Sequence, residues 1–234
     1  MHVPQWVPAR SASAAGLGVP SRESVLQTGR NVSLVFCSFN QFYKVYPEIW
    51  QAWMRVLLES GPDSVLWMLE FDGDSVSNLV EEAVMMGVAG WRIVVTSLLP
   101  INREFLSKGI CDLYLDTPRF NAHTTAKDAL WSGVPVLTLA GEGMASRVAA
   151  SLTLLLDPAA VTIARNLADY IEIGLRLAAR PRVLARLKER VRKLRWTSTV
   201  FDTVGWMRLW QRQLRNTADL VAAGYFPPAH MHLL

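Results

Sequence analysis

Long apolar runs are missing from this sequence. No stretch approaches the roughly 18 consecutive apolar residues that a membrane-spanning helix needs, and the first 20 residues lack the continuous apolar segment of a signal peptide. We therefore expect a soluble protein without membrane contacts. With 234 residues, 51% of them hydrophobic, the chain is long enough to bury a sizeable core, so a disordered protein is not expected.

Cysteine is also scarce. Only Cys37 and Cys111 are present, and both fall inside apolar runs that resemble strands. This placement favours buried free thiols in a reducing compartment over the disulfide framework of a secreted domain. We therefore expect the protein in the cytoplasm or the nucleus.

Several signatures of catalytic chemistry are absent. The sequence contains no Cys/His spacing of a metal site, no G-x-S-x-G elbow and no Walker-type phosphate loop. We set aside metal-dependent and serine-hydrolase chemistry and expect neither a metal nor another cofactor. The net charge is only +4, and we interpret the basic residues crowded between 176 and 195 as a solvated helical face, so no nucleic-acid partner is expected.

Three parts follow one another along the chain. Residues 1–30 are rich in Ser, Ala, Gly and Pro without periodicity, which predicts a flexible lead-in. Strand and helix patterns alternate over 31–160, which predicts an α/β lobe. The pattern of 161–234 predicts helices that pack on this lobe, the last of them spanning roughly 203–223.

Near-continuous apolar strands predict a Rossmann-like parallel sheet covered by helices on both faces. The expected strands lie at 32–38, 64–70, 92–97, 111–116 and 134–140. A helix is expected from Pro47 to about Ser60, because proline suits the first helical position and apolar residues recur on one face. Two more are expected, one ending near Met86 and one running from about Thr124 to Ser132.

Ligands of open α/β sheets bind outside the carboxyl ends of the strands, and a first polar cluster lies there at 38–44. It places Gln41 and Lys44 three residues apart just beyond the first strand. A lysine at this position can neutralise the negative charge that develops on a diphosphate leaving group. The alternative is a solvated loop lysine with no ligand.

A second polar cluster, residues 121–128, runs from a loop into a helix. There the free N–H groups of a first helical turn meet His123, Thr124 and Thr125, which together form a cradle for phosphate and ribose. Asp128 lies one turn beyond Thr124 on the same face, where its carboxylate can accept hydrogen bonds from ribose hydroxyls. The alternative is ordinary capping by either threonine, with His123 a structural residue.

A third cluster, Gly141–Arg147, also follows a strand and resembles a degraded dinucleotide fingerprint. The acidic residue that such a fingerprint needs about 20 positions later is not in place, because Asp157 comes too early. We therefore expect no nicotinamide cofactor. The glycines are interpreted as a tight turn that lets a ligand or a neighbouring backbone approach closely.

At these clusters the chain resembles a known family. The stretches FNQFYKVYPEIWQAWMRVLLESGPDSVLWMLE (39–70) and LDTPRFNAHTTAKDALWSGVPVLTLAGEGMASRVAASL (115–152) are similar to the C-terminal catalytic half of protein O-GlcNAc transferases. The resemblance runs from about Asn31 to the C-terminus. It implies the C-terminal, Rossmann-like lobe of a two-lobed GT-B glycosyltransferase, with a helical C-terminal tail.

The resemblance also implies roles for the polar residues. The reaction would be inverting transfer of GlcNAc from UDP-GlcNAc to Ser or Thr hydroxyls of acceptor proteins, without a metal. Lys44 matches the lysine that contacts the diphosphate and is our candidate catalytic residue, and Gln41 matches the neighbouring glutamine. The run His123, Thr124 and Thr125 matches the His-Thr-Thr that holds the diphosphate and nucleoside, and Asp128 matches the aspartate on the ribose.

The chain departs from the family pattern in two ways. The family's Lys and His after the proline of the third strand are replaced by Ile101–Phe105, with Arg103 and Lys108 as candidates to take over their contacts. The first catalytic lobe, with its active-site histidine, and the helical TPR repeats have no counterpart, so we expect the donor-binding half of such an enzyme. One alternative is a catalytically inactive nucleotide-binding or interaction module. Another is a protein O-fucosyltransferase using GDP-fucose, as in the related SPINDLY-like branch, where threonine tends to stand in place of His123.

Overall fold

A six-stranded parallel sheet forms the centre of the protein in its computed structural model, which describes residues 20–97 and 101–225. Its spatial order is β3-β2-β1-β4-β5-β6, and every neighbouring pair is parallel. The strands are β1 (Leu34–Ser38), β2 (Ser64–Leu69), β3 (Ile93–Thr96), β4 (Leu113–Leu115), β5 (Val136–Leu139) and β6 (Ile163–Ala164). The predicted α/β class and five of these strands are confirmed, whereas the two-residue β6 was missed.

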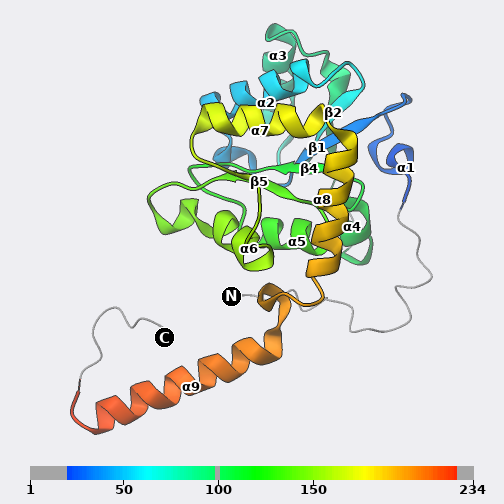
Figure 1. Ribbon diagram of the computed structural model, residues 1–234. Coiled ribbons are helices and arrows are strands. Elements are labelled where there is room, and N and C mark those ends of the chain that lie inside the picture. Colours follow the sequence, from blue (N-terminus) through cyan, green and yellow to red (C-terminus); the bar gives the residue numbers. More distant parts are fainter. Residues whose placement is uncertain (1–19, 98–100, 226–234) are drawn as a thin grey trace.

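Helices cover both faces of this sheet (Figure 1). One face carries α2 (Pro47–Glu59), α3 (Gly73–Met85) and α7 (Leu167–Ala178), and the other carries α4 (Ile101–Lys108), α5 (Thr124–Trp131) and α6 (Val148–Leu156). The helix α8 (Pro181–Leu194) runs across the edge between them and contributes Leu184 to one core and Val191 to the other. The expected helix starting at Pro47 is confirmed, with proline at its first turn.

Strand β1 shows how the sequence builds the two cores. Val35 and Cys37 point into the core shared with α5 and α6, and Phe36 points into the core shared with α2 and α7. Because both faces of a central parallel strand are buried, all three side chains are apolar. A separate point concerns membranes: no helix within residues 20–97 and 101–225 combines the length and the apolar character of a membrane span.

Part of the predicted lead-in is ordered. Residues 22–26 form the short helix α1 (Arg22–Leu26), whose Leu26 is buried in the core. Arg22 Nη2 also lies 2.6 Å from Asp112 Oδ2, next to the start of β4. The prediction of flexibility is therefore wrong for this segment, because one buried leucine and one long-range ion pair hold it. Residues 1–19 lie outside the described part of the chain.

The last helix, α9 (Thr203–Ala222), does not pack on the sheet. None of its residues is buried, and it projects away from the lobe after the short η4 turn (Thr199–Phe201), as Figure 1 shows. The expectation that all C-terminal helices pack on the lobe holds for α7 and α8 and is wrong for α9. Its exposed Trp206, Trp210 and Leu214 recur at helical spacing, but periodicity alone does not determine whether a helix packs on the lobe.

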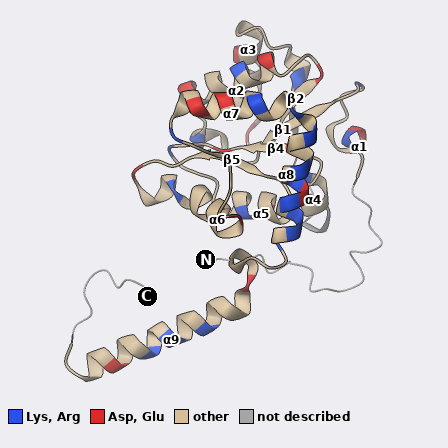
Figure 2. Ribbon diagram, in the orientation of Figure 1, with Lys and Arg blue, Asp and Glu red and all other residues tan. Residues whose placement is uncertain are grey.

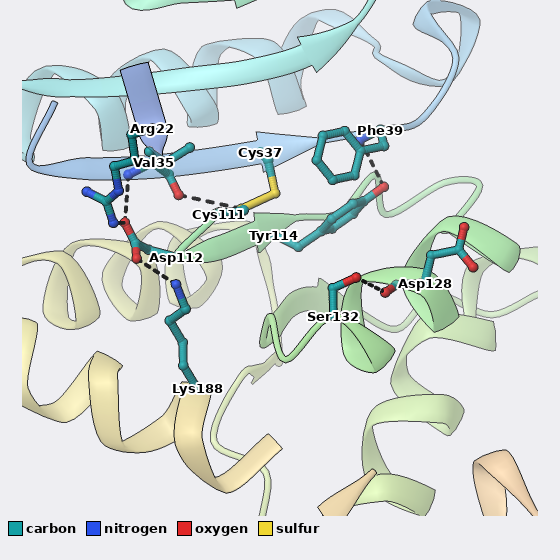
Figure 3. Close-up of a disulfide and its surroundings, with 10 residues drawn as sticks. All are labelled: Arg22, Val35, Cys37, Phe39, Cys111, Asp112, Tyr114, Asp128, Ser132 and Lys188. Atoms are coloured by element: carbon teal, nitrogen blue, oxygen red, sulfur yellow. Dashed lines mark hydrogen bonds and ion pairs between the residues drawn. A yellow bond between two sulfur atoms is a disulfide. The ribbon is translucent and has the colours of Figure 1, made fainter. Parts of the chain in front are cut away.

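The two cysteines are joined in a disulfide between residues 74 positions apart (Figure 3). Cys37 lies in β1 and Cys111 lies just before the neighbouring strand β4, so the bond joins two adjacent segments of the sheet. The prediction of free thiols is wrong, because the spacing in sequence did not reveal that the strands bring both sulfur atoms together. The predicted cytoplasmic or nuclear location relied on free thiols, and without them it stays a prediction.

Basic residues lie along much of α8 (Figure 2). Several of them are paired: Lys188 Nζ lies 2.8 Å from Asp112 Oδ1, and Arg190 Nε lies 2.5 Å from Asp157 Oδ2. Asp112 therefore binds both Lys188 and Arg22 (Figure 3). A cavity of about 300 Å³ next to this cluster lies at the amino ends of β1 and β4, opposite the predicted ligand edge.

The disulfide predicts a stability that depends on redox conditions. Both cysteines are fully buried, and closing a loop of this length restricts the unfolded chain. We expect unfolding in urea with a reductant to show a free energy of unfolding about 2–4 kcal/mol lower than without it. In the Cys37→Ala/Cys111→Ala variant the reductant should have no effect. Two alkylatable thiols in the unreduced, unfolded protein would contradict the disulfide.

Candidate functional site

The site forms where the carboxyl ends of β1 and β4 lie side by side. The strand order changes direction at this pair, because the chain proceeds outward from β1 through β2 to β3 and then returns to β4. Open α/β sheets bind ligands at such a point, since the loops after the two strands diverge and leave a crevice. The first two predicted polar clusters follow these two strands.

Lys44 reaches from the first loop to the second. It ends the short η1 helix (Phe42–Lys44), and its Nζ donates a hydrogen bond of 3.3 Å to the backbone oxygen of Asn121. The same ammonium lies 3.9 Å from the centroid of the Phe120 ring. Partial burial lowers the pKa of Lys44, and the negative charge of Asp116 opposes this shift. The solvated-lysine alternative does not describe this half-buried, engaged cation.

Gln41 occupies the N-cap position of η1 and is exposed. Its side chain makes no capping hydrogen bond. It therefore stands at the rim of the crevice, on the same loop as Lys44.

The second cluster opens α5. His123 takes the N-cap position, its side chain makes no capping bond, and its Nε2 lies 3.1 Å from the backbone oxygen of Ala145. Thr124 is exposed in the first turn, and the Thr125 hydroxyl donates to Asn40 Oδ1 at 2.9 Å. Neither threonine is the N-cap residue, whereas the contact with Ala145 gives His123 the structural role of that alternative. The His123 side chain caps no N–H group of this helix start.

Asp128 lies one turn further along α5 and is engaged by a buried cation. Lys108 Nζ, from the end of α4, lies 3.2 Å from Asp128 Oδ2. Lys108 was one of the two candidates to replace the lysine missing after Pro100. The structure brings it to the site through Asp128 rather than to the open crevice, because its side chain is almost wholly buried. The side chain of Arg103 lies outside the described residues.

The Gly141–Arg147 turn supports the second loop from behind. Its Ala145 carbonyl accepts hydrogen bonds from the Asn121 backbone N–H and lies at His123 Nε2. Within the turn, a Cβ added at Gly141 would meet Ser146 Oγ at 2.5 Å, so only glycine fits. A tight turn is thus seen at Gly141, where the close neighbour is the Ser146 side chain rather than neighbouring backbone, whereas a Cβ added at Gly143 would meet nothing within 4 Å.

Two polar residues that the sequence analysis did not single out connect these parts. Asn40 Nδ2 donates to Thr117 Oγ1 at 2.7 Å, and its Oδ1 accepts from Thr125. Asp116 Oδ1 accepts from the Ala122 N–H at 2.6 Å, and its Oδ2 accepts from Thr138 Oγ1 at 2.7 Å. A carboxylate directly after a buried strand was the signal that could have identified Asp116.

The predicted residues thus meet at one edge of the sheet. Lys44 and His123 bracket the Phe120–Asn121 segment, Thr124 and Thr125 open the helix beside it, and Asp128 lies behind them. The arrangement gives a half-buried cation and an uncovered helix start on adjacent loops. Both favour a negatively charged ligand such as a diphosphate.

Comparison with known proteins points to one family. The family model described as Glycosyl transferase family 41 matches residues 10–208. A probable UDP-N-acetylglucosamine–peptide N-acetylglucosaminyltransferase SEC of Arabidopsis thaliana is 34% identical over 86% of this chain and 20% of its own length. The UDP-N-acetylglucosamine–peptide N-acetylglucosaminyltransferase of Caenorhabditis elegans is 34% identical over 81% of this chain and 17% of its own length. The chain therefore spans about a fifth of these relatives.

Solved structures agree with the fold. An O-GlcNAc transferase mutant of Thermobaculum terrenum superposes with a TM-score of 0.70 at 29% identity, over 80% of this chain and 37% of the other. The C-terminal domain of a group 1 glycosyl transferase of Francisella tularensis matches with a TM-score of 0.56 at 13% identity, over 77% of this chain and 93% of that domain. The second likeness concerns the fold alone.

The bridging role of Asn40 predicts a measurable loss of stability. Replacing it in Asn40→Ala leaves the buried Thr117 hydroxyl and the half-buried Thr125 hydroxyl without this partner, which we expect to cost about 1–3 kcal/mol of unfolding free energy. Urea denaturation followed by circular dichroism measures the change. The control is Asn216→Ala on the exposed face of α9, where we expect almost no effect. Equal stabilities of the two variants would contradict the bridge.

Proposed function

Because this chain belongs to glycosyl transferase family 41, we propose that it is the donor-binding half of a protein O-GlcNAc transferase. It binds UDP-GlcNAc, and the enzyme to which it contributes transfers GlcNAc to Ser or Thr hydroxyls of proteins. One observation carries this proposal: the Lys44 ammonium donates a hydrogen bond to Asn121, in the loop that leads into the uncapped start of α5.

The chemistry of a sugar-nucleotide donor suits this arrangement. During transfer the bond between the anomeric carbon and the diphosphate breaks, and the acceptor oxygen bonds to the anomeric carbon from the opposite face. The departing UDP gains negative charge, which Lys44 and the N–H groups of α5 stabilise. Thr124 lies next to the same phosphates, and Asp128, held by Lys108, is proposed to accept hydrogen bonds from the ribose.

The acceptor protein needs a second wall. Catalysis requires the hydroxyl to be held against the donor, and the relatives are about five times longer than the part of them that this chain matches. We propose that a first catalytic lobe and helical TPR repeats supply this wall. The apolar face of α9 supports the proposal. Its Trp206, Trp210 and Leu214 recur at helical spacing and are exposed in the described part of the chain, as expected for a surface that binds another protein segment.

Calorimetric titration of the purified chain with UDP tests donor binding. We expect saturable binding that weakens by roughly 10- to 100-fold in Lys44→Ala, because a charge-assisted hydrogen bond contributes about 1.5–3 kcal/mol. Lys193→Ala is the matched control, since Lys193 is an exposed lysine paired with Glu189 on α8. GDP serves as the comparison ligand, and tighter binding of GDP than of UDP would favour the fucose donor. A folded protein that binds neither nucleotide would refute the proposal.

The uncovered α9 face predicts self-association of the isolated chain. Exposed apolar side chains on one side of a helix associate with one another when their partner is absent. In sedimentation velocity we expect concentration-dependent oligomers, and we expect Trp210→Glu to shift the protein towards monomer. Arg212→Glu, on the charged side of the same helix, changes charge without removing apolar surface and should leave the oligomers in place. Identical behaviour of the two variants would contradict an apolar contact through α9.

A further inference from the structure

Asp116 is a fully buried carboxylate beneath the donor site. Its Oδ1 accepts hydrogen bonds from the Ala122 N–H and from Asn40 Nδ2, the latter at 3.3 Å, and its Oδ2 accepts from the Thr138 hydroxyl. These donors come from the loop after β4, the loop after β1 and the strand β5. One carboxylate therefore ties together both loops that carry the predicted ligand contacts and a neighbouring strand.

The geometry also connects Asp116 with Lys44. The Ala122 N–H bonds to Asp116, and the carbonyl of the preceding residue, Asn121, accepts the hydrogen bond from Lys44 Nζ. The anchored loop thus presents its carbonyl to the cation. In addition, the negative charge of Asp116 raises the pKa of Lys44 against the lowering caused by burial.

We propose that Asp116 is a positioning residue of the donor site: it anchors the loop 117–123, whose Asn121 carbonyl accepts the hydrogen bond from Lys44, and it places a buried carboxylate beneath that cation. The carboxylate itself is inaccessible to a ligand, so it acts through Lys44 and the loop. The identity of the ligand in this inference rests on the proposed function. The effect of Asp116 on Lys44, in contrast, exists in the protein without a ligand.

Other titratable groups face this pair from the surrounding elements. Tyr46 precedes α2, Tyr114 lies in β4 and Tyr170 lies in α7, and burial raises the pKa of all three phenols. They stay neutral around neutral pH and do not replace the charge of Asp116. His123 and Lys44 both contact the Phe120 ring, and the exposed Arg119–Glu48 pair lies beside Tyr46.

The ionisation of Asp116 itself is accessible to experiment. Burial raises its pKa to about 7, and hydrogen bonds from Ala122, Thr138, Thr117 and Asn40 limit that rise. Above that pH the carboxylate is ionised, and its negative charge opposes the lowering of the Lys44 pKa by burial. The variant Asp116→Asn has nearly the same shape and keeps one acceptor oxygen, but it carries no charge.

The test follows the Lys44 ¹³Cε resonance by NMR during a pH titration of the ligand-free protein. We expect Asp116→Asn to lower the pKa of Lys44 by about one unit, the lower end of the effect of a nearby opposite charge. Two control variants should leave the pKa of Lys44 unchanged. Thr138→Val removes a hydrogen bond to Asp116 without removing its charge, and Asp112→Asn neutralises another buried aspartate, which binds Arg22 and Lys188 away from the site.

A second measurement needs no variant. In the wild-type protein, the ¹³Cγ resonance of Asp116 and the ¹³Cε resonance of Lys44 should shift together as Asp116 ionises. An unchanged pKa of Lys44 in folded Asp116→Asn overturns the inference. If that variant does not fold, the lack of a joint shift in the wild type overturns it instead.

Donor affinity separates this inference from the proposed function. If wild-type protein binds UDP, the alkaline decline of affinity should begin about one pH unit earlier in Asp116→Asn. If wild-type protein does not bind UDP, the proposed function fails, and the NMR titration still decides whether Asp116 supports the charge of Lys44.

Discussion

A carboxylate with no access to water is costly unless hydrogen-bond donors surround it, and Asp116 obtains its donors from three separate segments of the chain. Satisfying this one group therefore requires the ends of β1, β4 and β5 to lie in a single arrangement. The backbone oxygen of Asp116 extends the network, because it accepts from the Tyr170 hydroxyl of α7, which in turn accepts from Trp53 Nε1 of α2. The polar edge and the apolar core are thus joined.

The arrangement explains why two loops distant in sequence form one site. Lys44 follows β1 and His123 follows β4, and the hydrogen bonds of Asn40 and Asp116 hold the two loops at a constant separation. A preorganised site loses less free energy on binding a charged ligand, because its polar groups are already oriented. The network beneath the surface therefore matters for the ligand even where it makes no contact with it.

Much of this was predictable because local pattern and topology agree. Five strands were recognised from apolar runs, and the rule that parallel strands align their carboxyl ends identified the loops of Lys44 and His123. The strand β6 was missed, since Ile163 and Ala164 alone give no periodic signal. Asn40 and Asp116 were missed for other reasons. For Asn40 the reason is that its partner Thr125 lies 85 residues away, which no local pattern encodes. For Asp116 a local signal was present, a carboxylate directly after a buried strand, but it was not used.

The same limit of local patterns explains why the disulfide and the position of α9 were not predicted. Cys37 and Cys111 were correctly placed in buried runs, but only the adjacency of β1 and β4 brings them together. For α9 the periodicity predicted a helix, but it did not reveal that this helix projects away from the lobe.

The internal hydrogen-bond network of Asp116 and the exposed helix α9 have different consequences for the proposed donor binding and for transfer. The Asp116 network completes the edge that carries Lys44 and the start of α5 from within this chain, so the proposed donor binding depends on groups that the lobe itself contains. Transfer also needs an acceptor held at the open side of the crevice. Under the proposed function, a lobe with one complete edge and one exposed apolar helix face therefore binds the donor by itself, and transfer occurs only when a second wall is present.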